Sequence, residues 1–271
     1  MNKVAVAQIR SSIVKEENLR TALGLINDAK SKSAELIAFP EFLMAFSPAG
    51  QSAEELAELA ESVDGPFVNS LRDAARAAGV SVVATIYETC SLGNRVYDTA
   101  VWIDAGGRLL SVYRKLHLYD AFGFKESDKF HPGEDMALPV KSGENCFGMM
   151  ICYDLRFPEL ARLLTLAGAN VIVAPSGWVQ GDLKLEHWQT MIKARALENG
   201  CYLIAPGQVG NIYIGHSMVA DPLGRTIVDL GDKESFEVLN LDLKLIAETR
   251  EKLPLLKNRR TDVYARHPLT K

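Results

Sequence analysis

The chain has 271 residues, of which 48% are hydrophobic and 24% charged, and its 30 lysines and arginines against 34 aspartates and glutamates give a formal net charge of −4. This composition is typical of a folded globular protein and excludes disorder as the main state. No segment concentrates basic residues for nucleic acid, no apolar run reaches the roughly 18 residues of a membrane span, and the N-terminus lacks a secretory apolar segment. We therefore expect a cytoplasmic protein with neither nucleic acid nor membrane as a partner.

Two kinds of apolar segment follow one another along the chain. Short runs rich in β-branched and aromatic residues predict strands, and longer amphipathic runs predict helices. In chain order, the predicted strands cover residues 4–9, 36–39, 80–87, 96–103, 109–113, 147–152, 171–174, 202–205, 213–220, 226–228 and 236–239. The predicted helices cover residues 16–34, 53–60, 66–78, 158–167, 183–198 and 242–251.

The order of these elements indicates the fold class. Strands and helices alternate at the start of the chain and again after residue 152, whereas residues 80–115 predict antiparallel strands joined by glycine-containing turns. No linker or low-complexity segment divides the chain. We therefore expect a single domain, residues 1–271, of the α/β or α+β class, with mixed β-sheets covered by helices.

Several common site motifs are missing from the sequence. There is no glycine-rich dinucleotide or phosphate motif, and the five histidines share no metal-ligand spacing, so we expect no cofactor and no metal. The segment around Ser217 lacks the second glycine of a nucleophile elbow, so Ser217 is interpreted as a strand or pocket-lining residue. The four cysteines fit neither a disulfide framework nor a C-x-x-C pair and are expected to be free thiols.

A carboxylate follows the predicted strand at residues 36–39. Pro40 ends the strand, and Glu41 lies between apolar neighbours. In isolation such a glutamate is most often a surface loop residue, but burial at a strand end suits a general base. Glu41 is therefore a candidate base.

Two cations follow the predicted strand at residues 109–113. Strand alternation places Lys115 on the face of Ser111 and Tyr113, opposite Arg114. Taken alone, this pattern equally fits an exposed strand end.

Cys152 ends a fully apolar strand, and a helix is predicted to begin at Pro158. A helix N-terminus favours a thiolate, and the turn between strand and helix frees backbone N–H groups. The other three cysteines, Cys90, Cys146 and Cys201, lack this setting and are interpreted as small apolar residues.

Glu41, Lys115 and Cys152 at three strand ends make a coherent nucleophilic site. The carboxylate can take the thiol proton, and the thiolate can attack a carbonyl carbon. The lysine cation, together with a backbone N–H, can stabilise the oxyanion that forms. This combination predicts covalent thiol chemistry.

Three segments carry a resemblance to a known family. FPE at residues 39–41, RKLHL at 114–118 and ICYDLRFPE at 151–159 resemble the three catalytic signatures of the nitrilase (carbon–nitrogen hydrolase) superfamily, in the same order and at similar separations. The resemblance continues through GHS at 215–217 and RRTDVY at 259–264 and so covers nearly all of the chain.

The resemblance implies a fold and an assembly. The fold is a four-layer αββα sandwich, in which two mixed sheets pack face to face and helices cover them. The assembly is a homodimer or a higher homo-oligomer, and we expect the C-terminal tail at about residues 253–271 to take part in dimer contacts.

The resemblance also implies residue roles. Glu41 is the expected base, Lys115 the oxyanion stabiliser and Cys152 the nucleophile, with the backbone N–H of Tyr153 as a second oxyanion donor. Glu126 falls where family members carry a second glutamate that helps to position substrate and water, although a surface glutamate is a fair alternative.

The sequence around Cys152 indicates the branch of the family. Its C-Y-D-x-R-F-P-E form resembles the ω-amidase and deaminated-glutathione amidase group, whereas true nitrilases typically have Trp-Glu where this chain has Tyr153-Asp154. Carbamoylases carry an arginine where this chain has Leu155. We therefore expect hydrolysis of a small linear amide to a carboxylate and ammonia through a thioester on Cys152. Nitrilase or N-carbamoyl amino acid hydrolase activity, and a catalytically silent binding or assembly protein, are the alternatives.

Three further residues are candidates for the substrate pocket: Trp178, His187 and Arg156. For Arg156, an ion pair with Glu159 or Asp154 that braces the turn after Cys152 is the favoured interpretation.

Overall fold

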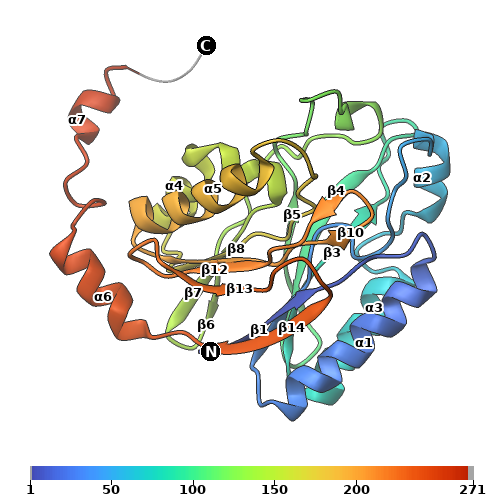
Figure 1. The fold of residues 1–271 in the computed structure, drawn as a ribbon, viewed down its shortest axis with the longest axis horizontal. Helices are drawn as coiled ribbons and strands as arrows, with labels where there is room; N and C mark the ends of the chain where they lie inside the picture. The colour runs from blue at the N-terminus through green and yellow to red at the C-terminus, as the bar shows by residue number, and fades with distance from the viewer. Residues whose placement is uncertain (1, 268–271) are drawn as a thin grey trace.

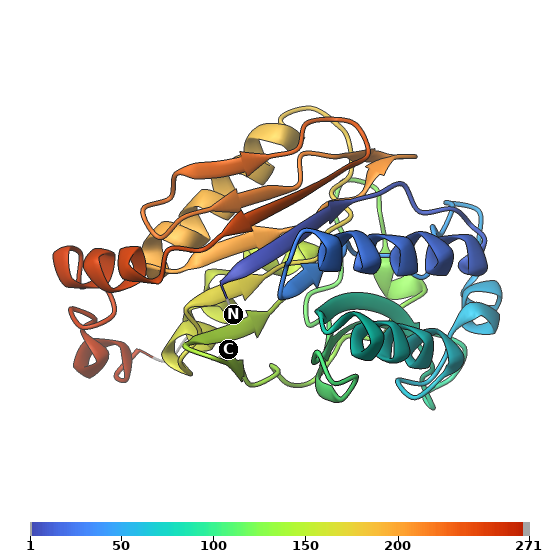
Figure 2. The same cartoon turned by 90° about the horizontal axis from the view of Figure 1, so that it is seen from below.

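The computed structural model describes residues 2–267, which form two six-stranded sheets packed face to face with helices on their outer faces (Figures 1 and 2). The expected αββα sandwich is confirmed. The first sheet has the order β14-β1-β2-β3-β4-β5 and contains β1 (Lys3–Gln8), β2 (Leu36–Ala38), β3 (Ser81–Glu88), β4 (Tyr97–Ile103), β5 (Leu109–Arg114) and β14 (Ser235–Asn240). The second has the order β13-β12-β9-β8-β7-β6 and contains β6 (Val140–Ser142), β7 (Asn145–Met149), β8 (Val171–Val173), β9 (Tyr202–Ala205), β12 (Met218–Ala220) and β13 (Thr226–Asp229).

The remaining elements are helices and one short strand pair. The α-helices are α1 (Lys15–Ser31), α2 (Ala53–Leu59), α3 (Pro66–Ala78), α4 (Pro158–Leu166), α5 (Lys184–Asn199), α6 (Leu243–Lys252) and α7 (Thr261–Tyr264). Two 3₁₀ turns, η1 (Glu126–Asp128) and η2 (Cys152–Arg156), and the pair β10 (Val209–Gly210) and β11 (Tyr213–Ile214) complete the described chain.

Strand β1 shows how the layers are built. Val4 and Val6 belong to the apolar cluster that joins the two sheets, whereas Ala5 and Ala7 pack into the cluster beneath α1 and α3. Because both faces of this strand are buried, its sequence is continuously apolar rather than alternating. On the other side of the molecule, α4 and α5 cover the second sheet.

One aromatic pair joins the sheets across the middle of the sandwich. The ring centroids of Trp102 on β4 and Phe147 on β7 lie 4.9 Å apart. Both side chains are almost fully buried. The contact packs β4 against β7, and because β5 pairs with β4, it helps to place the strands that precede Lys115 and Cys152.

Most of the predicted elements are confirmed, and their ends differ for local reasons. The predicted helix at residues 66–78 is exact and carries Pro66 in its first turn. The antiparallel run at residues 80–115 is β3, β4 and β5. The first helix ends at Ser31 rather than at residue 34, because Ser33 has a positive φ of 58°. Leu183, with a φ of 56°, precedes α5 instead of starting it.

The predicted strand at residues 213–220 is wrong. Gly215 and His216 have positive φ values of 76° and 54°, which no strand accommodates, so the segment divides into β11 and β12. Ser217 lies in the break. It is fully buried, and its Oγ accepts a hydrogen bond from the Gly207 N–H at 2.7 Å, so it braces the loop and does not line the pocket.

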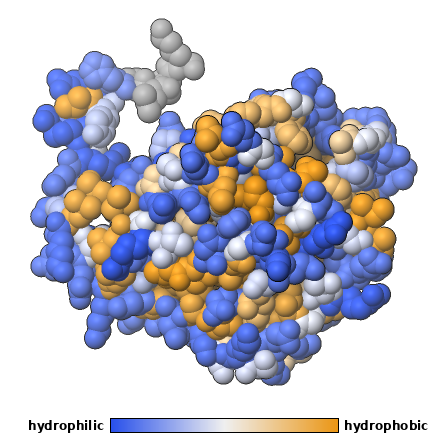
Figure 3. Space-filling view, in the orientation of Figure 1, coloured by the Kyte–Doolittle hydropathy of each residue, from blue (hydrophilic) through white to orange (hydrophobic). Residues whose placement is uncertain are grey.

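The surface carries some exposed apolar residues. Figure 3 shows hydrophobic residues interspersed among hydrophilic ones on the face seen in Figure 1. The segment that contains α6 and α7 extends away from the sandwich (Figure 1). Residues 268–271 of the predicted dimer tail lie outside the described residues. Within residues 2–267, no helix combines the length and apolar character needed to cross a bilayer.

Candidate active site

Three strand ends bring Glu41, Lys115 and Cys152 together. Glu41 follows β2, Lys115 follows β5, and Cys152 follows β7. Both Glu41 and Lys115 are essentially inaccessible to solvent, at 0% and 1% exposure, and Cys152 is buried apart from a small part that faces the pocket. The three residues singled out from separate motifs are therefore one buried cluster.

Glu41 is fixed by both of its carboxylate oxygens. Oε1 accepts a hydrogen bond from Lys115 Nζ at 2.8 Å, and Oε2 accepts one from the backbone N–H of Gly177 at 2.5 Å. Gln208 Nε2 donates to the Glu41 carbonyl oxygen at 2.9 Å. These contacts come from three different chain segments, so the orientation of this carboxylate depends on the assembled fold.

Gly177 allows the close approach of Glu41. A Cβ at this position would lie 2.9 Å from the Phe42 ring and 3.0 Å from Glu41 Oε2, which is closer than side chains normally tolerate. Any larger residue here would push the carboxylate or the ring away.

Lys115 is the cation of the cluster. Its Nζ contacts Glu41 Oε1 at 2.8 Å and Glu126 Oε1 and Oε2 at 2.9 and 2.8 Å. Burial by itself lowers the pKa of Lys115, but the carboxylates of Glu126 and Glu41 reverse this effect and raise it well above its ordinary value. Lys115 is therefore a cation at neutral pH.

The backbone at Cys152 is a sharp turn. Its φ is +43°, and its N–H donates to the carbonyl of Pro175 at 2.9 Å. A non-glycine residue in this region of backbone space is strained and is common at functional sites. The following N–H, that of Tyr153, belongs to the first turn of η2, where N–H groups lack an acceptor within the helix.

Cys152 lacks the helix N-terminus that the sequence suggested as support for a thiolate. Burial and then the charge of Glu41 raise the pKa of the Cys152 thiol well above its ordinary value, although Lys115 opposes them. The element that begins at Cys152 is a short 3₁₀ turn, and α4 starts only at Pro158, so no long helix dipole points at the sulfur. The resting group is a thiol, and it needs a base.

Asp154 fastens this turn to the neighbouring sheet. Its Oδ2 accepts hydrogen bonds from Ile151 N–H at 2.9 Å and from Tyr113 Oη at 2.6 Å, and its Oδ1 accepts one from the His117 N–H at 3.1 Å. These contacts link the end of β7 to the end of β5. His117 Nδ1 also lies 2.7 Å from Oδ1, so the Asp154 carboxylate is occupied without Arg156.

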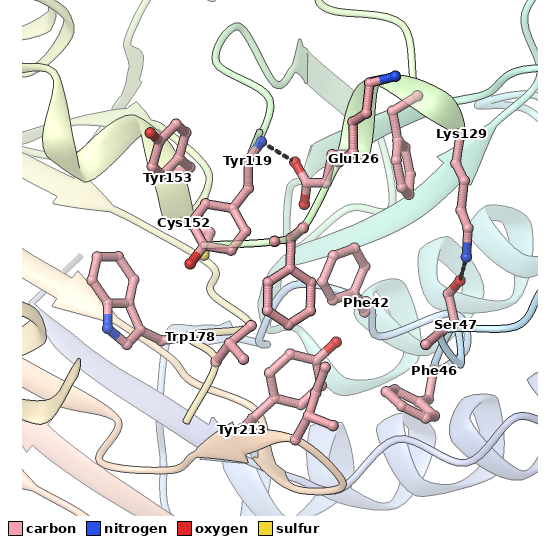
Figure 4. Close-up of a pocket in the computed structure, with 18 of the residues that line it drawn as sticks. Phe42, Phe46, Ser47, Tyr119, Glu126, Lys129, Cys152, Tyr153, Trp178 and Tyr213 are labelled. Atoms are coloured by element: carbon pink, nitrogen blue, oxygen red, sulfur yellow. Dashed lines mark hydrogen bonds between the residues drawn. The ribbon is translucent and has the colours of Figure 1, made fainter. Parts of the chain in front are cut away.

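Glu126 belongs to the cluster rather than to the surface. Besides its two contacts with Lys115, its Oε2 accepts the Tyr119 N–H at 2.7 Å (Figure 4). Burial, followed by the charge of Glu41, raises the pKa of Glu126, whereas Lys115 lowers it. The surface alternative for this residue is therefore wrong.

A cavity of about 510 Å³ opens onto Cys152. Figure 4 shows Tyr153 and Trp178 beside Cys152, and Lys129 with Ser47 at the opposite end. Its apolar walls include Phe42, Phe46, Phe130, Trp178 and Tyr213. A cavity of this kind suits a small molecule with an apolar stem and a few polar groups.

Arg156 lines this cavity and does not pair with Glu159 or Asp154, so the favoured interpretation of this residue is wrong. Its guanidinium lies 4.8 Å from the centre of the Trp178 ring, and its Nη2 lies 3.4 Å from His187 Nδ1. Its buried Nε has no hydrogen-bond partner among residues 2–267. His187 is not a lining residue but lies behind Arg156.

Lys184 is a second cation in the cavity wall, which the sequence motifs did not indicate. Its Nζ hydrogen-bonds Tyr119 Oη and lies 3.9 Å from the centre of the Phe122 ring. Its backbone carbonyl accepts the Trp178 Nε1–H at 2.9 Å. Burial and the charge of Arg156 lower the pKa of Lys184.

Asp98 is a second residue of the site that the sequence motifs did not indicate. In the sequence it stands out only as a charged residue within the apolar strand at residues 96–103.

Comparison with known proteins places this geometry in a family. Residues 3–251 match the model of the carbon-nitrogen hydrolase family. The chain belongs to the carbon–nitrogen hydrolase family. It is therefore a hydrolase of carbon–nitrogen bonds, and the resemblance seen in its three motifs is confirmed.

Individual relatives agree with this assignment. This hydrolase is 35% identical over 257 residues to the deaminated glutathione amidase of Escherichia coli O157:H7, covering 95% of the chain and 97% of the relative. It is 32% identical to the deaminated glutathione amidase of Mus musculus, and the match covers 98% of this chain and 86% of that relative. The structure of Saccharomyces cerevisiae Nit3, a member of branch 10 of the nitrilase superfamily, superposes with a TM-score of 0.84 at 29% identity, covering 96% of both chains. The predicted amidase type of branch is thus confirmed.

Gly177→Ala should lower kcat by about tenfold or more, because the added methyl displaces Glu41 from Lys115 and from the thiol. Steady-state kinetics with an amide substrate would measure this loss. Gly24→Ala is the matched control, since a Cβ at Gly24 meets nothing within 4 Å. Equal kinetics for Gly177→Ala and Gly24→Ala would contradict the tight fit.

Proposed function

We propose that this hydrolase cleaves a small linear amide to a carboxylate and ammonia, with Cys152 as the nucleophile. The observation that supports this most strongly is the buried contact of Glu41 with Lys115 beside a thiol that needs a base. The alternatives of nitrile or N-carbamoyl hydrolysis use the same three residues, and the identity to named amidases favours the amide.

The first half of the reaction forms a thioester. Glu41 takes the proton from Cys152 Sγ, and the thiolate attacks the amide carbonyl carbon. Lys115 Nζ and the Tyr153 N–H hold the oxyanion of the tetrahedral intermediate. The intermediate then collapses, the C–N bond breaks, and protonated Glu41 returns the proton to the leaving nitrogen, which departs as ammonia.

The second half releases the acid. Glu41 takes a proton from water, and the hydroxide attacks the thioester carbonyl in the same oxyanion site. Glu126 orients this water from the other side of Lys115. The C–S bond breaks, the carboxylic acid leaves, and the thiolate of Cys152 recovers its proton from Glu41.

Arg156 and Lys184 indicate the acyl group. Two cations line the cavity beside Trp178, and neither has a carboxylate partner among the described residues. A guanidinium with a buried, unpaired N–H is well suited to bind a carboxylate. We therefore propose an amide whose acyl half carries a carboxylate at its far end.

We propose in addition that the protein is a homodimer whose contacts include the C-terminal segment. This segment extends from the sandwich and exposes Leu253 and Leu255 (Figure 1). Helices α4 and α5 likewise expose Leu163, Leu166 and Leu197. Apolar side chains gathered in this way favour association. The single domain over residues 1–271 and the cytoplasmic location stay predictions.

Incubation with an amide substrate should add an acyl group to Cys152, because the thioester is an obligatory intermediate. Intact-mass spectrometry of acid-quenched protein would detect it. Cys152→Ala should show neither adduct nor turnover, whereas Cys90→Ala, the control, should show both. An adduct that persists in Cys152→Ala would rule out the assignment.

Arg156→Met should raise KM by about tenfold or more for an amide with an acyl carboxylate, since a charge-assisted hydrogen bond is lost. The same variant should change KM little for an uncharged amide of equal length. Arg108→Met, on an exposed turn far from the cavity, serves as the control. If both substrates were affected equally, Arg156 would have no role in carboxylate binding.

Leu253→Glu combined with Leu255→Glu should convert the dimer to a monomer, because two charges would be buried at the contact. Light scattering after gel filtration would report the mass. Leu138→Glu is the control, since Leu138 is exposed on a different part of the surface. An unchanged dimer mass in the double variant would disprove a role for this segment.

A further inference from the structure

A fourth acid lies in the catalytic cluster, and the mechanism above does not use it. Asp98 is carried by β4, and its side chain is only 2% exposed. Neither carboxyl oxygen has a hydrogen-bond partner among residues 2–267. An ionised carboxylate in this position would be desolvated and would receive no hydrogen bond, which is strongly unfavourable.

Lys115 does not supply the missing partner. Its Nζ lies 3.7 Å from Asp98 Oδ2, which exceeds hydrogen-bond distance. The ammonium has three N–H groups, and it already makes three contacts of 2.8 to 2.9 Å with Glu41 and Glu126. Asp98 therefore lies behind the cation, within ion-pair distance of it but without a hydrogen bond to it.

A neighbouring acid shows how this fold accommodates a buried carboxylate that is ionised. Glu88 on β3 is also largely buried, but Arg114 donates to its two oxygens at 2.7 and 2.6 Å. Thr99 Oγ1 adds a third hydrogen bond at 2.8 Å. Asp98, on the adjacent strand, has none of these contacts.

The charged and titratable groups around Asp98 come from four directions. Glu41 faces it from the end of β2, Lys115 from the end of β5, Glu126 from η1 and Tyr87 from β3. Burial and then the charge of Glu41 raise the pKa of Asp98 well above its ordinary value, and Lys115 opposes them without cancelling the effect.

We propose that Asp98 is a positioning residue that works as a neutral carboxylic acid. It fills the space behind Lys115 and leaves the three N–H groups of the ammonium to Glu41 and Glu126 in the resting enzyme, and one of them to the oxyanion during the reaction. When Asp98 loses its proton to solvent, a third negative charge competes for Lys115 and opposes the formation of the Cys152 thiolate. Its neutrality is therefore a condition for catalysis. Only this last, kinetic part depends on the proposed function.

The stability of Asp98→Asn tests the protonation state without reference to activity. In the wild type, the folded state keeps the Asp98 proton and the unfolded state releases it above the ordinary Asp pKa, so stability falls as pH rises until the raised pKa is passed. The amide of the Asp98→Asn variant has the shape of the acid but does not titrate, so it makes no such contribution to the pH dependence of stability. Asp98→Asn should therefore gain in Tm relative to the wild type between about pH 5 and about pH 8.

The opposite result would overturn the proposal. If Asp98 were an ionised partner of Lys115, Asp98→Asn would be less stable than the wild type at neutral pH, by an amount that stays the same between about pH 5 and about pH 8. Glu88→Gln is the matched control for this case, because it removes an ionised acid held by Arg114. Its Tm at neutral pH should fall.

Infrared spectroscopy of the wild type gives a second measurement that requires no variant. With isotope-labelled aspartate, the acid C=O band of a protonated Asp98 should be present at neutral pH and shifted by the label. Absence of a shifted aspartic acid band at neutral pH would overturn the proposal.

Kinetics test the link to catalysis. The ratio of kcat/KM for Asp98→Asn to that of the wild type should rise by about threefold or more from neutral to alkaline pH, because only the wild type loses activity as Asp98 ionises. A ratio that is constant with pH would refute the effect on catalysis. If instead the amidase assignment fails, the Tm and infrared results still stand, so the two failures are distinguishable.

Discussion

One ammonium compensates the two glutamates of the catalytic cluster. Lys115 contacts both Glu41 and Glu126, and all three are held between the sheets and the cavity. An unpaired charge in such a place costs several kcal/mol, so neither glutamate could remain ionised there without the lysine. The strand ends that carry them must therefore meet, and the contact between Trp102 and Phe147 keeps the sheets at the distance at which they do.

The same constraint shapes the chemistry. Burial and then the charge of Glu41 raise the pKa of the Cys152 thiol, so the nucleophile stays protonated until a substrate arrives. Glu41 is also the base that takes the thiol proton. Because the proton moves from Cys152 to Glu41, the transfer leaves the net charge of the cluster unchanged. Lys115, already oriented, needs little rearrangement to meet the oxyanion, and such preorganisation is the main source of electrostatic catalysis.

Much of this could be predicted from the sequence. The antiparallel run at residues 80–115 and the three principal site residues follow from apolar periodicity and from motifs at strand ends, whereas the four layers follow from the resemblance of those motifs to a family. The failures share a cause. Arg156 was assigned to a neighbour in sequence, whereas it contacts Trp178 and His187, and the predicted strand at 213–220 breaks where two residues adopt positive φ. Both depend on contacts between segments far apart in the chain.

The sequence by itself determined which chemical groups are present and which strand each of them follows. It could do so because local patterns indicate where a strand ends and which residues come next. Only the tertiary structure decided their protonation and partners. The burial of Asp98 behind Lys115, the thiol state of Cys152 and the unpaired Nε of Arg156 depend on distances between side chains from different strands and on how much water reaches them. Those quantities exist only once the two sheets have closed on each other.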